Sequence, residues 1–201
     1  MVKIKGKVGL LAGILLFSWG CGNPYYFDLQ TEVPPRHEDW RIDKVLLVED
    51  VEISETYRDS RIVCRESPFQ VKYHNTASWS KSPDELIEDA VVLFWKQRAV
   101  FKKVNTYGSG KDPDWTMRMR IDVIEKYLVQ KNWYARLALE MEIVNPENNE
   151  TLLVHSFDRR SALGKNRIRL VPEKISQILY EELLKVEAKL QEIARSKKED
   201  S

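Results

Sequence analysis

The sequence predicts an α+β domain: a mixed, mostly antiparallel sheet of about seven strands with two main helices packed on one face. Two observations lead to this fold class. Residues 115–123 and 133–143 alternate apolar and polar side chains, which is the period of strands with one wet face. Residues 83–98 and 172–193 instead repeat apolar side chains every three or four positions, which is the period of an amphipathic helix.

The first 20 residues have the proportions of an export signal. Three lysines, Lys3, Lys5 and Lys7, precede an apolar run over 8–17. This run is too short to cross a hydrocarbon core, which needs about 20 residues. We therefore expect residues 1–20 to be a signal peptide that ends before Cys21.

Cys21 resembles the acylated cysteine of a bacterial lipobox. Gly20 and Cys21 fit that pattern, whereas Ser18 and Trp19 stand where it prefers Leu and a small residue. We expect Cys21 to be the lipidation site; a cleaved soluble export signal and an uncleaved anchor are the alternatives. By the sorting rule of enteric lipoproteins, a residue other than Asp after the cysteine indicates the outer membrane, and Gly22 stands there.

Residues 21–40 read as a lipidated tether with a first strand. Pro24, Pro34 and Pro35 favour an extended, semi-rigid chain, and residues 25–29 have strand composition. A single α+β domain is expected over 41–195, followed by a charged, frayed tail over 196–201.

The first half of the domain contains several short strands. We expect a strand over 45–53 and a polar turn over 57–60. Two further strands over 61–66 and 69–74 form a hairpin that turns at Ser67-Pro68.

A capping box predicts where the first main helix begins. Ser82 is the expected N-cap, Pro83 the first helical residue, and Glu85 the acidic partner three residues after the cap. The helix should end near Gln97 or Arg98. Its apolar stripe is expected to contain Leu86, Ala90, Leu93 and Phe94.

The second half reads as a strand over 101–104, a loop over 107–113 and a long hairpin. The two alternating strands meet at a turn near Lys131-Asn132, which would place Arg118 and Arg120 opposite Glu140 and Glu142. A turn over 145–149 leads into a third strand over 151–159.

The last helix is expected to open at Pro172. Its apolar residues suit packing on the sheet, and its last five also fit a two-heptad coiled-coil seam.

Composition and residue spacing argue against catalysis and nucleic-acid binding. The net charge is +1, so the chain lacks the electrostatic footprint of a nucleic-acid-binding protein. His37, His74 and His155 are scattered and do not have metal-ligand spacing, so we expect no metal and no cofactor. Cys64 is expected to be an inert, half-buried thiol, and residues 108–111 a surface turn rather than a phosphate loop.

Trp79 lies in a polar stretch just before the predicted helix cap. One interpretation is that it folds back onto the helix N-terminus. The other is that it is an exposed anchor for a protein or lipid partner.

Several features, in this order, resemble the ABC-type transport auxiliary lipoproteins, the group that contains paraquat-inducible lipoprotein C. The resemblance covers roughly residues 21–193. It is carried by Cys21, the strand Tyr25-Tyr26-x-x-Leu29, the run Tyr57-x-Asp59-x-Arg61-Ile62-Val63-x-Arg65, residues 73–79, Pro83-x-x-Leu86, Val100-Phe101-x-x-Val104, the long hairpin and the closing helix.

This resemblance implies a non-enzymatic partner of an ABC system that carries an MCE-domain protein and moves phospholipid across the periplasm. It places the chain on the periplasmic face of the outer membrane, held by its acyl anchor, and suggests a homo-oligomer. Trp79, Tyr73 and Pro83 are the residues we expect to contact the partner. The alternatives are an envelope-assembly lipoprotein that scaffolds a β-barrel or a lipopolysaccharide-handling complex, and an exported enzyme.

Overall fold

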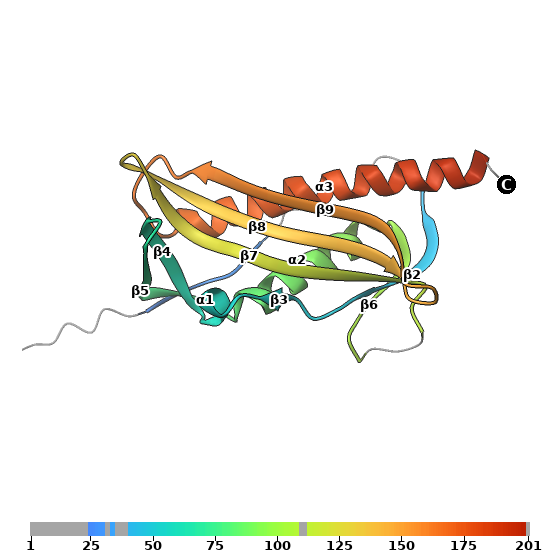
Figure 1. Ribbon diagram of the computed structural model, residues 1–201, viewed down its shortest axis with the longest axis horizontal. Helices are drawn as coiled ribbons and strands as arrows, with labels where there is room; N and C mark the ends of the chain where they lie inside the picture. The colour runs from blue at the N-terminus through green and yellow to red at the C-terminus, as the bar shows by residue number, and fades with distance from the viewer. Residues whose placement is uncertain (1–23, 31–32, 35–39, 109–111, 200–201) are drawn as a thin grey trace, which may run out of the picture.

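The long strand β7 (Trp115–Val129) is the centre of the sheet. A computed structural model describes residues 24–30, 33–34, 40–108 and 112–199. Strand β8 (Asn132–Asn145) pairs antiparallel with β7, and β9 (Glu150–Ala162) pairs antiparallel with β8. These three strands form the curved meander that runs along the molecule in Figure 1.

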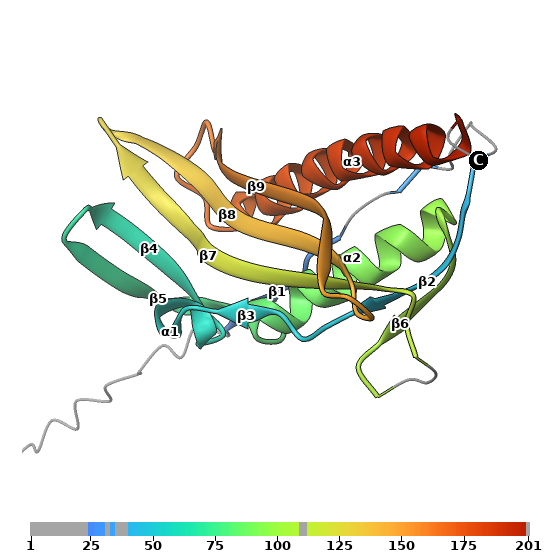
Figure 2. The same ribbon diagram turned by 45° about the vertical axis from the view of Figure 1, so that its right-hand side comes forward.

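The other edge of β7 is covered by three strands in succession, all parallel to it. They are β2 (Ile42–Val48), β3 (Glu52–Ile53) and β4 (Arg61–Ser67). The sheet therefore forks, as Figure 2 shows.

One branch of the fork ends at β6 and the other at β1. Strand β6 (Phe101–Thr106) pairs parallel with β2. On the other branch, β5 (Gln70–Trp79) pairs antiparallel with β4, and β1 (Tyr25–Phe27) pairs parallel with β5. The predicted mixed sheet is confirmed, and the described residues form nine strands rather than about seven.

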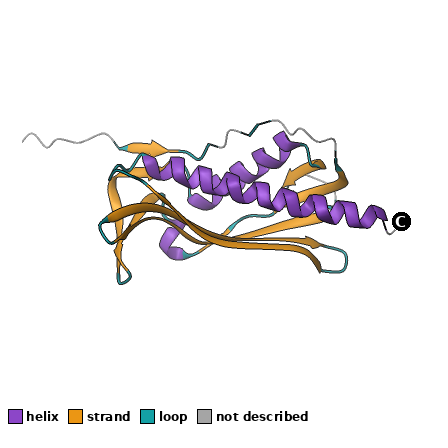
Figure 3. Ribbon diagram, turned by 90° about the horizontal axis from the view of Figure 1, so that it is seen from above, coloured by secondary structure: helices purple, strands orange, loops and turns teal. Residues whose placement is uncertain are grey.

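The two main helices lie together on one face of the sheet (Figure 3). They are α2 (Pro83–Arg98) and α3 (Leu170–Glu199), and the rings of Phe94 and Tyr180 meet edge to face between them, 6.0 Å apart. Within the described residues, no helix is both long and apolar enough to cross a membrane.

A β-bulge at Asp122 changes which side chains of β7 face the helices. Before it, Met119 and Ile121 are buried opposite Met141 and Leu139; after it, the pairing moves on by one residue. Glu125 consequently lies on the face of β7 that points away from the helices, opposite Arg136 on β8. This shift creates the buried carboxylate network described below.

Several local predictions need correction. Residues 57–60 do not form a simple polar turn, because α1 (Glu55–Arg58) includes the buried Tyr57. The strand expected over 45–53 is broken into β2 and β3, since its second half joins β7 further along. Strand β5 continues five residues beyond the expected end, to Trp79, because β1 pairs with that extension.

The helix predictions hold with small changes at the ends and on one face. Helix α2 begins at Pro83 and ends at Arg98 as predicted, but the Ser82 hydroxyl donates to the Glu85 carboxylate (3.0 Å) and does not cap a backbone amide. Leu93 is 43 % exposed, so it lies outside the buried stripe. Helix α3 begins two residues before Pro172, and its apolar positions Leu183, Val186 and Leu190 are fully buried in the core.

Candidate functional site

The three residues predicted to contact a partner do not form an exposed anchor. Trp79 is only 1 % exposed and belongs to the hydrophobic core, so the exposed-anchor interpretation of this side chain is wrong. Pro83 is also buried, at the first turn of α2. Tyr73 is half-buried: its hydroxyl donates to the Thr56 carbonyl (3.1 Å), and the Arg61 guanidinium lies 4.5 Å from its ring centre. The predicted signal peptide over 1–20 and the predicted lipidation site Cys21 lie outside the described part of the chain.

A histidine–carboxylate pair is buried between β9 and α3. His155 Nε2 lies 2.8 Å from Glu182 Oε2, and the two side chains are 8 % and 1 % exposed. Burial acts to raise the pKa of Glu182, but hydrogen bonds from Lys185, Arg159 and His155 outweigh it and leave that pKa below its ordinary value. The pair is closed off from solvent beneath α3. We therefore assign it to fixing the helix on the sheet.

A second buried carboxylate, Glu125, lies on the opposite side of the sheet. Its side chain is fully buried and accepts hydrogen bonds from Tyr57 Oη and Arg65 Nε, each at 2.8 Å. Arg136 Nη1 lies 3.4 Å away and also binds Asp158 through two nitrogens. Burial raises the pKa of the Tyr57 phenol to about 12. The network holds α1 and β4 against β7.

The thiol of Cys64 has the properties expected of an inert side chain. Cys64 is buried, and burial raises its thiol pKa. Its strand partner on β7 is Lys126, whose ammonium lies 4.0 Å from the centre of the Trp133 ring and whose pKa is lowered by burial. No group of His, Cys, Asp and Glu side chains in the described ranges could hold a metal ion.

The exposed aromatic residues lie elsewhere than predicted. Tyr25 and Tyr26 are 65 % and 67 % exposed, Tyr107 is 74 % exposed, and Phe69 is 98 % exposed. Phe69 follows Ser67-Pro68 and lies in the turn of the β4–β5 hairpin, not in the strand where we expected it. The sequence pattern that could have identified Phe69 as exposed is an aromatic residue directly after a Ser-Pro turn.

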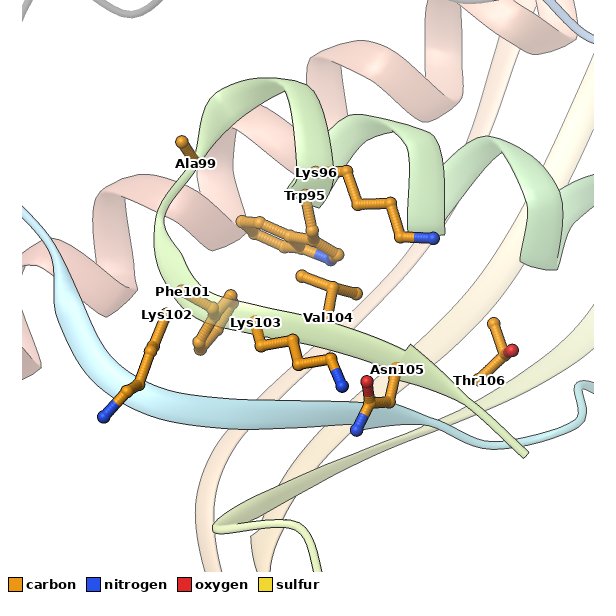
Figure 4. A pocket seen from close by; sticks show the side chains of 9 residues that line it. All are labelled: Trp95, Lys96, Ala99, Phe101, Lys102, Lys103, Val104, Asn105 and Thr106. Carbon is orange, nitrogen blue, oxygen red and sulfur yellow. The ribbon is translucent and has the colours of Figure 1, made fainter. Parts of the chain in front are cut away.

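A groove of about 510 Å³ runs between the end of α2 and strand β6. Figure 4 shows the Trp95 indole on the helix facing Val104 on the strand, with lysines around them. The groove is lined by Trp95, Lys96, Ala99, Phe101, Lys102, Lys103, Val104, Asn105 and Thr106.

Two features make this groove suitable for an extended, acidic segment. Its lining includes three lysines and no carboxylate; Lys102 pairs with Asp43 at 3.2 Å, whereas Lys96 and Lys103 form no ion pair with the described residues. Among the described strands, β6 pairs with β2 alone, so it lies at an edge of the sheet where another strand could be added. The buried Trp95 Nε1 donates no hydrogen bond within the described structure.

Solved structures share this fold at low sequence identity. The crystal structure of protein XCC0632 from Xanthomonas campestris, assigned to the DUF330 family, aligns with a TM-score of 0.74 at 15 % identity over 88 % of this chain and 99 % of that one. A crystal structure of an uncharacterized protein gives a TM-score of 0.67 at 12 % identity over 84 % and 99 % of the two chains. The hypothetical protein CT253 from Chlamydia trachomatis gives 0.50 at 7 % identity over 73 % and 96 %.

Sequence comparison gives the family. None of the curated proteins matches this chain. A family model described as the ABC-type transport auxiliary lipoprotein component matches residues 27–174, which include every strand from β2 to β9 and both α1 and α2. The chain therefore belongs to the ABC-type transport auxiliary lipoprotein family.

Proposed function

We propose that this chain is a non-enzymatic, lipid-anchored accessory component that docks the MCE-domain protein of an ABC system to the outer membrane. The observation that carries the proposal is the family match over residues 27–174. In this role the system moves phospholipid across the periplasm, and the chain contributes placement and binding rather than chemistry. The buried positions of His155 and Cys64 agree with such a role.

The proposed anchor is an acyl-modified Cys21 on the periplasmic face of the outer membrane. The positive first residues, the short apolar run and the Gly20-Cys21 pair support it. Two or more acyl chains give stable membrane attachment, whereas one chain gives only marginal binding.

The proposed docking surface is the groove between α2 and β6. An extended segment of the partner would add a strand to β6, and Lys96 and Lys103 would meet its carboxylates. Of the three residues first expected to contact the partner, Tyr73 is the one that stays partly accessible, and it remains a second proposed contact. Trp79 and Pro83 are buried near the start of α2, so neither is proposed as a direct contact.

The anchor is tested by mass spectrometry of the mature N-terminus, together with separation of inner and outer membranes. We expect an acylated Cys21 in the outer-membrane fraction, and a soluble periplasmic protein for Cys21→Ser. An intact, unmodified first segment in the inner membrane would contradict the proposed placement.

Docking is tested by crosslinking the full-length protein in its native envelope and identifying the product. We expect an MCE-domain protein, and a large loss of that product when Lys96 and Lys103 are both changed to Glu. Lys165→Glu, an exposed charge reversal next to Gly164 and away from the groove, is the matched control. Recovery of β-barrel or lipopolysaccharide-handling components alone would overturn the proposal in favour of an envelope-assembly role.

A further inference from the structure

The tip of the β4–β5 hairpin exposes apolar side chains to water. Phe69 is 98 % exposed in the turn and Val71, two residues further on, is 37 % exposed. Figure 2 shows this hairpin projecting from the body of the sheet. Phe69 and Val71 together give this projecting tip an exposed apolar surface.

The direction of β1 relates this tip to the start of the domain. Strand β1 runs parallel to β5, with Tyr25 opposite Ala77, so both strands begin on the side of the hairpin tip. On the paired strand β4, six residue steps separate Ser67, opposite Gln70, from Arg61, opposite Ser78, a length of about 20 Å. The exposed rings of Tyr25 and Tyr26 lie at this start.

The length of the tether limits how far the domain can stand from its anchor. Four residue steps separate Cys21 from Tyr25, and a fully extended chain covers at most about 14 Å over that length. The hairpin tip lies about 20 Å beyond Ser78, the residue level with Tyr26, measured along the axis of β4. With that axis directed at the bilayer, the tip reaches the membrane before the tether is fully extended.

We propose that the β4–β5 hairpin tip is a second membrane contact, with Phe69 inserted at the boundary between headgroups and acyl chains. The charged pair nearest the tip, Lys72 and Glu66, is already joined at 2.8 Å, so the tip carries little net charge into the interface. This inference rests on the proposed acylation of Cys21.

The test uses the full-length, acylated protein in vesicles of phosphatidylethanolamine and phosphatidylglycerol that contain brominated acyl chains. An environment-sensitive fluorophore is attached at Phe69→Cys in a Cys64→Ala background. Tyr107→Cys is the control, because Tyr107 is 74 % exposed and follows β6 at the other end of the molecule (Figure 1). We expect blue-shifted, bromine-quenched emission at position 69 and water-like, unquenched emission at position 107.

The outcomes distinguish failure of the proposed membrane contact from failure of the proposed function. Water-like emission at both positions, with acylation confirmed by mass, would overturn the membrane contact and leave the proposed function intact. Emission at position 69 that changes only when an MCE-domain protein is added would overturn it in favour of a protein contact. Absence of acyl groups on Cys21 would overturn the proposed anchor, and the membrane contact with it.

Discussion

Arg98, the last residue of α2, donates two hydrogen bonds to the carboxylate of Glu187 on α3, at 2.7 and 2.9 Å. Their side chains are 12 % and 7 % exposed, so the pair is largely shielded from water. A third nitrogen of Arg98 donates to the carbonyl of Pro34 at 2.9 Å. One guanidinium therefore joins the segment before β2 to both main helices.

This pair should be strongly coupled. In a double-mutant cycle of Arg98→Ala and Glu187→Ala, we expect a coupling energy of about 1.5–3 kcal/mol, because a two-fold charged hydrogen bond is lost from a shielded site. Urea unfolding of the four variants measures it. The exposed pair Lys81 and Asp89, at 2.6 Å, is the control and should show no measurable coupling. Equal coupling in both pairs would contradict the role given to Arg98.

Glu182→Gln should destabilise the domain by about 2 kcal/mol, because three hydrogen-bond donors lose their charged acceptor. The neighbouring Glu181→Gln is the control; that side chain is 38 % exposed and should contribute less than about 1 kcal/mol. Chemical denaturation at pH 7 compares the two variants, and equal losses would contradict the assignment.

The contribution of Glu182 should depend on pH. Its pKa is lowered in the folded state, so its stabilising effect is complete above the unfolded value, near 4.3, and is lost as the pH falls through the folded value. The free energies of unfolding of the native protein and Glu182→Gln should therefore converge below about pH 4. A constant difference down to pH 2 would show that the charge is not what matters.

Tyr57→Phe should cost about 1–2 kcal/mol, because the Glu125 carboxylate loses a buried donor. The phenol pKa is raised to about 12, so its contribution is complete below pH 10 and is lost as the pH rises toward 12. Absorbance titration at 295 nm should lose its step near pH 12 in the variant. Tyr107→Phe, at an exposed position, should leave stability unchanged.

Trp79→Ala should destabilise the domain by about 3–5 kcal/mol, since it removes a fully buried indole. Phe69→Ala, at an almost fully exposed position, should change the free energy of unfolding by less than about 0.5 kcal/mol. The midpoints of urea unfolding of Trp79→Ala and Phe69→Ala measure this difference. A small effect at Trp79 would show that this side chain is not part of the core. Because Trp79 is buried, loss of partner binding in Trp79→Ala would reflect unfolding of the domain and not loss of a direct contact.

The long hairpin shows how far the sequence predicts pairing. Its alternation predicted that Arg118 and Arg120 face Glu140 and Glu142 across the ladder, and the structure places Arg118 opposite Glu142 and Arg120 opposite Glu140. Arg120 lies 3.8 Å from Glu140, but the Arg118 side chain instead pairs with Glu49 at 3.3 Å, on the segment after β2. The alternation of the two strands is local information, whereas the bulge at Asp122 sets their exact register and the competing carboxylate comes from 69 residues away.

The candidate sites were harder to predict for the same reason. Trp79 has polar neighbours in sequence, yet β1 and β4 lie on either side of its strand and the side chain enters the core. Phe69 has strand composition, yet nothing in the described structure covers the turn in which it lies. Exposure depends on what other elements cover a residue, and a single stretch of sequence does not contain that information.

By itself, the sequence determined the helix from Pro83 to Arg98, the alternating hairpin and the family, because each depends on residues close together in the chain or on their order. Only the tertiary structure decided which strands cover β7, that His155 is closed beneath α3, and that Phe69 stands on a projecting tip. These features join segments distant in sequence. Their free energy comes from burial and from the pairing of buried charges, which exist only once the segments have packed.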